Sequence, residues 1–256
     1  MYFFILIFRN IVFYVLFFVF SVVTIPLFSI VVCFKGIFFC NKRLTFRLIR
    51  KLICLWGFCV VKILTFTIAK IKYKDYSNLK SLEPCIFVCN HRSFSDGFLV
   101  SYPVFNYECI QIVNKWPFKM PILGIIARLA GYISIHQMDF ECFLEKNINF
   151  IKQGVSIVCF PEGTRSGNNV LGDFYSAIFR VALKAKCTIV PICFSGNENI
   201  PKKGSFILNP GIIKINKLKP LLWEEYKDLT AFVLKNRVRK IILEELSKMD
   251  KLNEKL

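Results

Sequence analysis

The sequence predicts an α/β fold preceded by an apolar helical segment. Short apolar runs typical of strands alternate with amphipathic stretches between residues 85 and 215. Hydrophobic residues make up 55% of the chain, and 28 of its 256 residues are phenylalanine, which is more than a soluble domain normally contains. We therefore expect part of this chain to be solvated by something apolar, such as a lipid bilayer.

The first apolar run, residues 11–34, contains no charged residue. As a helix it would be about 36 Å long, whereas the hydrocarbon core of a bilayer is about 30 Å thick. This length predicts a membrane anchor; the alternative is a cleaved signal peptide, although the run is too long for the apolar region of one. A second run, residues 52–69, is interrupted only by Lys62 and is expected either to lie in the membrane interface or to form the second arm of a helical hairpin.

Basic residues gather around these two runs. The formal net charge is +18, but the charges border apolar segments, which favours anionic membrane lipids as partners and argues against nucleic acid. Six of the charges lie near the junction of the runs: Lys35, Lys42, Arg43, Arg47, Arg50 and Lys51. By the positive-inside rule they predict a protein of the cell inner (cytoplasmic) membrane whose larger domain faces the cytoplasm.

Beyond the apolar runs, the hydrophobic pattern changes repeatedly between the periods of strands and helices. Strands are predicted at residues 85–89, 109–113, 132–135, 155–160, 188–193 and 212–215. Helices are predicted at residues 98–105, 119–129, 140–153 and 174–185, with a charged packing helix within residues 223–255. A linker is expected between residues 70 and 84.

A polar turn directly after the first predicted strand contains His91 and, five positions later, Asp96. The unperturbed pKa of histidine lies near working pH, and a carboxylate can fix the tautomer of the ring and support the imidazolium. This pair could therefore activate a hydroxyl. The alternative is structural, because Ser93 and Asp96 also have the spacing of a capping box at a helix start.

The motif Phe-Pro-Glu-Gly-Thr-Arg-Ser at residues 160–166 follows another apolar run. Both polar turns are expected to leave the same end of one sheet, where open α/β sheets place their ligands. Gly163 permits close approach of the backbone to a ligand, Thr164 supplies a hydroxyl and Arg165 a planar fork suited to two phosphate oxygens. We predict an anion site here; the alternative is a loop in which Arg165 pairs with Glu162.

Together, and in this order, the two motifs resemble those of the glycerolipid acyltransferase family, and more closely its bacterial 1-acylglycerol-3-phosphate acyltransferases. The resemblance runs from about residue 72 to 215 and includes weaker blocks at residues 115–124, 131–136 and 189–192. It implies a mixed sheet flanked by helices. It also implies a division into membrane-anchoring helices at residues 1–70 and an acyltransferase catalytic domain at residues 71–256.

The resemblance further implies that His91 is a general base oriented by Asp96. The acceptor would be the sn-2 hydroxyl of 1-acylglycerol 3-phosphate, the donor acyl-CoA or an acyl carrier protein, and the product phosphatidate. The substrate phosphate would be held by residues of the second motif and one upstream lysine: Lys115, Glu162, Gly163, Thr164 and Arg165. For Glu162, ordering the loop is the other expected role. No cofactor is implied.

Two positions depart from the family pattern near the polar end of the substrate. Gln137 stands where arginine is usual, and Tyr175-Ser176-Ala177 where Lys-x-Gly often follows Phe174. Glutamine brings no charge, so Lys115 and Arg165 are expected to neutralise more of the phosphate. Two alternatives therefore stay open: an acyltransferase for another lysophospholipid or an aminolipid, and a non-catalytic lipid-binding membrane protein.

The 11 cysteines are scattered, often within apolar runs, and are never spaced as Cys-x2-Cys. This pattern indicates reduced, buried side chains rather than a disulfide framework. Only two histidines are present, His91 and His136, so no metal site is expected.

Overall fold

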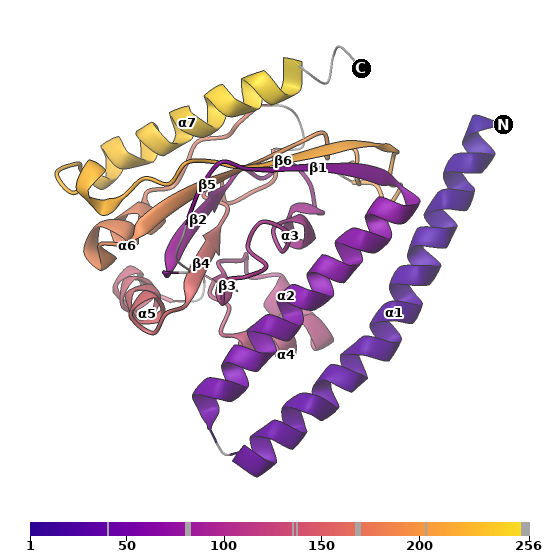
Figure 1. Ribbon diagram of the computed structural model, residues 1–256, viewed down its shortest axis with the longest axis horizontal. Helices are drawn as coiled ribbons and strands as arrows, with labels where there is room; N and C mark the ends of the chain where they lie inside the picture. The colour runs from indigo at the N-terminus through magenta and orange to yellow at the C-terminus, as the bar shows by residue number, and fades with distance from the viewer. Residues whose placement is uncertain are drawn as a thin grey trace.

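A six-stranded mixed sheet forms the centre of the fold in the computed structural model (Figure 1), which describes residues 1–39, 41–79, 83–134, 136, 138–166, 170–202 and 204–251. The strands are β1 (Ala69–Asp75), β2 (Cys85–Cys89), β3 (Cys109–Gln111), β4 (Ser156–Cys159), β5 (Thr188–Ser195) and β6 (Gly211–Lys217). Their order is β1-β6-β5-β2-β4-β3. The four strands from β5 to β3 are parallel, β6 is antiparallel to β5, and β1 is parallel to β6.

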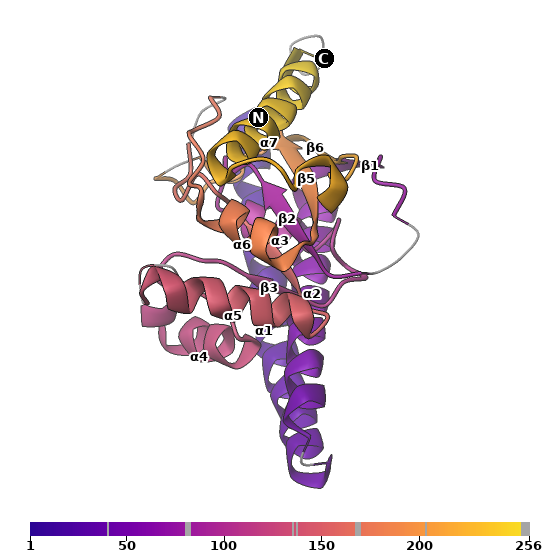
Figure 2. The same cartoon turned by 90° about the vertical axis from the view of Figure 1, so that its left-hand side faces the viewer.

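Helices cover both faces of this sheet (Figures 1 and 2). They are α1 (Tyr2–Phe39), α2 (Lys42–Thr67), α3 (Asp96–Leu99), α4 (Pro121–Ala130), α5 (Phe140–Lys152), α6 (Ala177–Ala185) and α7 (Ala231–Lys251), with short 3-10 helices at Pro117–Lys119 and Trp223–Glu225. Because successive strand side chains point to opposite faces, β2 serves two cores. Ile86 and Val88 pack with residues of α5, α6 and α7, while Phe87 packs with residues of α2 and α3.

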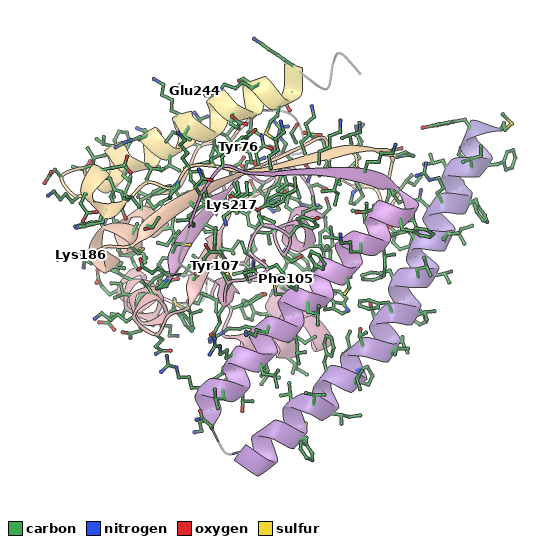
Figure 3. All side chains as sticks on the ribbon, in the orientation of Figure 1. Tyr76, Phe105, Tyr107, Lys186, Lys217 and Glu244 are labelled. Atoms are coloured by element: carbon green, nitrogen blue, oxygen red, sulfur yellow. The ribbon has the colours of Figure 1, made fainter. Side chains whose placement is uncertain are left out.

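The α1–α2 pair extends past the edge of the sheet, as Figures 1 and 2 show. Over Tyr2–Phe34, α1 is long and apolar enough to cross a membrane. Many of its large apolar side chains are exposed, including Phe4, Phe8 and Phe18, and in Figure 3 the side chains of α1 that point away from α2 stand clear of the rest of the fold. An apolar surface of this kind is expected to contact lipid.

Polar contacts attach both helices of the pair to the rest of the fold. Near the start of α1, the Asn10 side chain donates to the carbonyl of Leu208 at 3.0 Å and accepts from its backbone nitrogen at 2.8 Å. On α2, the buried Arg50 guanidinium donates to the carbonyl of Ala130 at 2.9 Å and to Glu108 at 2.7 Å. Arg50 belongs to the basic cluster predicted to mark the cytoplasmic side, and the structure uses its charge inside the protein.

The predicted elements are mostly present, with three corrections. Strand β1 takes up residue 69, the end of the second apolar run, and residues 70–75 of the predicted linker, and it pairs with β6 along its whole length. The predicted strand at residues 132–135 is reduced to one bridge between Ile133 and Ile112, and residue 135 lies outside the described residues. The predicted helix at residues 98–105 is replaced by the short α3, which ends at Leu99, and by the turns that follow it. Proline at position 103 cannot donate the backbone hydrogen bond that a continued helix would need.

Candidate active site

The first motif begins where β2 ends. Asn90, directly after that strand, donates from its side-chain nitrogen to the carbonyl of Phe194 at 3.0 Å and accepts from the Phe194 backbone nitrogen at 2.8 Å. Its amide therefore replaces a pair of ladder hydrogen bonds to β5 and fixes the point at which the chain leaves the sheet. His91 follows immediately, so its position is set by the carboxyl ends of two parallel strands.

His91 and Asp96 form a hydrogen-bonded pair, with Nδ1 of the ring 2.8 Å from Oδ2 of the carboxylate. A carboxylate only accepts, so in the neutral form of the ring Nδ1 carries the proton and Nε2 carries the lone pair. Asp96 is completely buried, whereas the His91 side chain is 22% exposed. The arrangement orients a basic nitrogen at the edge of a cavity.

The Asp96 carboxylate is held by several further donors. Oδ2 accepts from the backbone nitrogens of Arg92 at 2.7 Å and Ser93 at 2.9 Å, and Oδ1 accepts from the Asn197 side chain. The bond to Ser93 is half of the capping box considered above. The other half is missing, because the Asp96 backbone nitrogen donates to the Ser93 carbonyl at 3.3 Å, and the Ser93 hydroxyl oxygen accepts from the Ser95 backbone nitrogen instead, also at 3.3 Å. The Ser93 hydroxyl itself donates to the carbonyl of Ile200 at 2.8 Å.

The second motif packs directly against the first through Glu162. This buried carboxylate accepts from the His91 backbone nitrogen at 2.6 Å and from the Gly172 backbone nitrogen at 2.9 Å. Burial raises the pKa of Glu162, and the two backbone hydrogen bonds oppose that shift. The backbone nitrogen of Ser166 also donates to the His91 carbonyl at 3.0 Å, so the two polar turns form one unit.

The alternative loop, in which Arg165 pairs with Glu162, is not what the structure shows for these two residues. Both oxygens of Glu162 accept from backbone nitrogens, and the Arg165 guanidinium lies over the ring of Phe94, 5.8 Å from its centroid. Phe94 belongs to the turn between His91 and Asp96, so this contact brings the cation toward the first motif.

These residues meet at a cavity of about 1430 Å³. Its polar end includes His91, Lys115, Gly163, Thr164 and Arg165. Its remaining wall is largely apolar and comes in part from the α1–α2 pair, through residues such as Ile25, Phe28, Val32, Leu52 and Trp56. Arg50 and Arg180 line the cavity as well. A largely apolar cavity with basic groups beside His91 fits an amphiphile with an anionic head.

The predicted site residues thus divide into two groups. Five line the cavity, while Asp96 and Glu162 are absent from its lining and lie behind it, where they hold the backbone and side chain of His91. Tyr175, one of the departures from the family pattern, lines the cavity and packs against Gly163, whose φ of +71° suits glycine. The other departure, Gln137, lies outside the described residues.

Sequence reasoning missed three residues of this site: Asn197, Arg92 and Asp250. Asn197 donates to Asp96, and Asp250 binds Arg92, the residue after His91. Asn197 follows β5 at the same end of the sheet as the two motifs, so the rule that pointed to those turns could also have pointed to it. The sequence carries no comparable signal for Asp250, which lies in α7.

Comparison with known proteins supports an acyltransferase fold and family. A family model described as Acyltransferase matches residues 70–195. The chain is similar to a chloroplastic 1-acyl-sn-glycerol-3-phosphate acyltransferase of Arabidopsis thaliana, with 32% identity over 183 residues, which is 69% of this chain and 49% of the relative. It is also similar to the 1-acyl-sn-glycerol-3-phosphate acyltransferase of Salmonella typhimurium, with 23% identity over 240 residues, which is 91% of this chain and 95% of the relative.

The chain spans about half the length of the Arabidopsis relative and of a similar chloroplastic acyltransferase from Brassica napus. Among solved structures, it is similar to the 1-acyl-sn-glycerophosphate acyltransferase PlsC from Thermotoga maritima, with a TM-score of 0.77, 20% identity, and coverage of 96% of this chain and 98% of that one. At this identity the likeness concerns the fold. The family model, the similar relatives and the two intact motifs together show that residues 70–195 belong to the acyltransferase family.

Proposed function

We propose that this chain is an O-acyltransferase that moves a fatty acyl group from acyl-CoA or an acyl carrier protein to the sn-2 hydroxyl of 1-acylglycerol 3-phosphate, giving phosphatidate. The observation that carries this proposal is the placement of the His91–Asp96 pair. The hydrogen-bonded imidazole and the second motif line the same cavity, and the rest of its lining is largely apolar. A base is therefore set where the hydroxyl of a lysophospholipid and the thioester of an acyl donor can meet.

In this proposal His91 acts as general base. Its Nε2 takes the proton of the acceptor hydroxyl while that oxygen attacks the thioester carbonyl; the new C–O bond forms and the C–S bond breaks. The departing thiolate takes up the proton from the imidazolium, which restores the neutral ring. Asp96 keeps the ring oriented and stabilises its positive charge during the transfer. Thiolates leave readily, so direct transfer between the two bound substrates suffices.

The phosphate of the acceptor is proposed to bind at the second motif. Arg165 and Lys115 supply positive charge, Thr164 a hydroxyl, and the backbone at Gly163 a close approach. For Glu162 we propose an ordering role, because both of its carboxylate oxygens accept from backbone nitrogens and it does not line the cavity. The group would shape the phosphate site without touching the phosphate.

We also propose how the chain meets its lipid substrates. Residues 1–70 would form the membrane-anchoring part and residues 71–256 the catalytic domain, at the inner membrane and facing the cytoplasm. The exposed apolar side chains of α1 support the anchor, and residues of α1 and α2 that line the cavity support lateral entry of the acceptor from the bilayer. Anionic lipids would attract the remaining basic residues near the α1–α2 junction.

The test is lipid mass spectrometry on the purified full chain in detergent micelles. Acyl-CoA and acyl carrier protein are offered separately as donors to a panel of acceptors: 1-acylglycerol 3-phosphate, other lysophospholipids and an aminolipid. Phosphatidate should be the main product, and the His91→Ala variant should form none above background. A main product from a phosphate-free acceptor would replace the proposed acceptor, and no acyl transfer to any acceptor would favour the lipid-binding alternative.

A further inference from the structure

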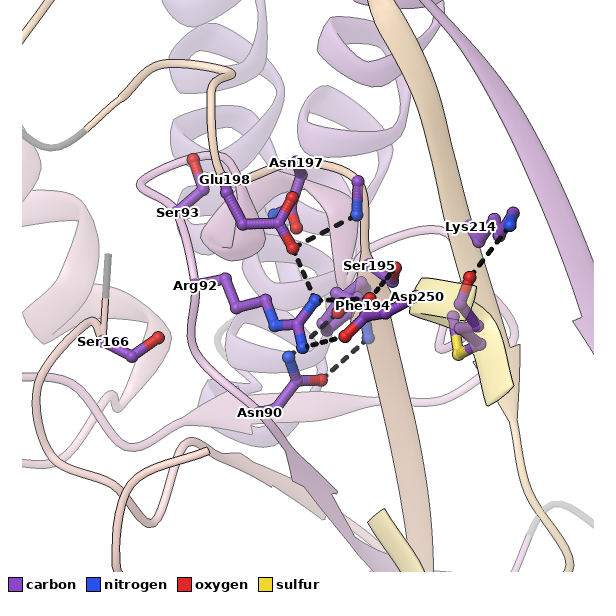
Figure 4. Close-up of polar contacts among 12 residues, drawn as sticks. Asn90, Arg92, Ser93, Ser166, Phe194, Ser195, Asn197, Glu198, Lys214 and Asp250 are labelled. Carbon is purple, nitrogen blue, oxygen red and sulfur yellow. Dashed lines mark hydrogen bonds and ion pairs between the residues drawn. The ribbon is translucent and has the colours of Figure 1, made fainter. Parts of the chain in front are cut away.

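Arg92, the residue after His91, is held by two carboxylates from distant parts of the chain (Figure 4). Its side chain is only 2% exposed. The guanidinium donates to both oxygens of Asp250, at 2.9 Å and 2.7 Å, and also to Glu198. Paired hydrogen bonds of this kind fix the direction of a guanidinium as well as its position.

The carboxylates are themselves anchored outside the first motif. Asp250 lies in the last turn of α7, 158 positions from Arg92, and accepts from the Ser195 hydroxyl at 2.6 Å. The buried Lys214 on β6 donates to the carbonyl of Met249 at 3.0 Å, next to Asp250. Arg92 is thus tied to β5, β6 and α7 together, as the contacts drawn in Figure 4 show.

Arg92 links these contacts to the His91–Asp96 pair. The backbone nitrogen of Arg92 donates at 2.7 Å to Oδ2 of Asp96, the same oxygen that binds Nδ1 of His91 at 2.8 Å. A shift of Arg92 would therefore move the backbone of its neighbour His91 and the donor that holds the Asp96 carboxylate. Small displacements of this kind are costly for a reaction that depends on near-attack geometry.

We propose that Asp250, acting through Arg92, positions the His91–Asp96 pair. Asp250 is not among the residues that line the cavity, so it is a positioning residue and not a catalytic one. Burial alone would lower the pKa of Arg92, but the two carboxylates outweigh burial and raise it. Burial would raise the pKa of Asp250, yet the hydrogen bonds from Arg92 and Ser195 lower it. Both groups are therefore charged at neutral pH.

The ion pair is not needed merely to dock α7. That helix already buries an apolar stripe against the sheet: Leu234, Val238, Ile242, Leu246 and Met249. Buried ion pairs are in general weak contributors to stability, because desolvation of the charges offsets their attraction. What the Arg92–Asp250 pair adds is a fixed distance between the end of α7 and the turn that carries His91.

The experiment compares Asp250→Asn with Glu244→Gln in the full chain. Glu244 is on the same helix, and its pair with Lys240 is solvent-exposed, so its substitution makes the same change of charge without touching Arg92 (Glu244 is labelled in Figure 3). Asp250→Asn should lower kcat for transfer to 1-acylglycerol 3-phosphate about tenfold and leave KM within about twofold. Glu244→Gln should leave both constants unchanged, and Asp250→Glu should recover part of the loss.

A second measurement reads His91 directly. The chain contains two histidines, so NMR spectra of the chain labelled with nitrogen-15 at histidine show two sets of ring signals. The set that disappears in His91→Ala belongs to His91. Asp250→Asn should shift that set, and Glu244→Gln should not. If Asp250→Asn does not fold, Ser195→Ala, which removes one hydrogen bond to Asp250, should produce a smaller shift of the same signals.

Unchanged His91 signals in a folded Asp250→Asn variant would overturn the proposal, even if its activity or stability falls, because the role would then be structural only. Equal kcat values for Asp250→Asn and Glu244→Gln would also overturn it. The activity test rests on the proposed function, whereas the NMR measurement of His91 does not. If the wild-type chain transfers no acyl group, the proposed function fails, and a His91 shift in Asp250→Asn still supports the positioning role.

Discussion

The carboxylate of Glu162 accepts a hydrogen bond from the backbone nitrogen of His91 at 2.6 Å. The two residues are separated by 71 positions in the chain and belong to different polar turns. Through this bond, the motif proposed to bind phosphate also fixes the start of the motif proposed to carry the base. A change at Glu162 should therefore affect the base as well as the phosphate site.

Glu162→Gln is expected to lower both stability and kcat. Glutamine offers one acceptor oxygen where glutamate has two, so its NH2 group must face the backbone nitrogen of either His91 or Gly172. Leaving a buried N–H without an acceptor costs about 1–3 kcal/mol, which thermal unfolding of the purified chain can measure. Glu145→Gln, at an exposed position in the middle of α5, is the matched control and should change neither quantity. Stability equal to wild type in Glu162→Gln would show that this carboxylate does not join the loops.

A comparison of Gly163→Ala with Gly154→Ala separates the effect of backbone strain from the effect of contact with Tyr175. A Cβ at position 163 would lie 2.9 Å from Cε2 of Tyr175, and φ is +71°. Gly154 also has a positive φ, +84°, but a Cβ there meets nothing within 4 Å, so Gly154→Ala reports the strain alone. Each variant should lose about 1–2 kcal/mol of stability from the left-handed backbone.

Activity should distinguish the two alanine variants. The Tyr175 side chain is largely exposed and can turn away from a new methyl group, but doing so changes the wall of the cavity. We expect Gly163→Ala to raise KM for the acceptor, and Gly154→Ala to leave it unchanged. A Tyr175→Ala background should reduce the KM effect of Gly163→Ala. The same KM effect in that background would show that Tyr175 is not the residue through which the methyl group acts.

Arg165→Lys should weaken binding of a phosphate-bearing acceptor. A lysine is a point charge that cannot reproduce the planar fork, so we expect a loss of about 1–3 kcal/mol, which is about 5- to 140-fold in KM. Arg237→Lys, at a partly exposed position on α7, is the control. The measurement is the initial rate against acceptor concentration, with one phosphate-bearing and one phosphate-free lysolipid. If both acceptors suffer equally, Arg165 shapes the loop through Phe94 instead of reading phosphate.

Attachment to membranes should survive high salt. At 1 M ionic strength the Debye length is about 3 Å, so charge attraction to lipids is screened, whereas burial of the apolar surface of α1 is not. Sedimentation of cell membranes after washes in 1 M salt and in alkaline carbonate measures this. The chain should remain in the pellet in both washes. Its appearance in the supernatant would show that α1 does not insert into the bilayer.

The sequence predicts those site residues that directly follow a strand. β2 and β4 are buried on both faces and read as apolar runs, so the turns that follow them, with His91 and Glu162, could be found. β1 was missed because three exposed lysines alternate with Ile71 and Tyr73. That alternation is typical of an exposed edge strand, but its charge made the segment look like a linker.

Side-chain pairing between distant segments was beyond the reach of sequence patterns. Hydrophobic periodicity identifies which face of α7 is buried, yet it says nothing about Asp250 at the end of the helix meeting Arg92. In the same way, the sequence presents Arg50 as one member of a basic cluster beside a membrane. Its partner in the structure is Glu108, which directly precedes β3. Such partners become visible only when the chain is folded.

Turnover by the His91→Ala variant tests the central claim most directly. The purified full chain and the variant are compared under saturating acyl donor and 1-acylglycerol 3-phosphate, with thermal unfolding used to confirm that both are folded. Removal of the base should lower kcat at least about a hundredfold, and Asp96→Asn, which leaves the base but weakens its orientation, should be less severe. A folded His91→Ala variant that keeps more than about a tenth of wild-type turnover would contradict the assignment of His91 as the general base.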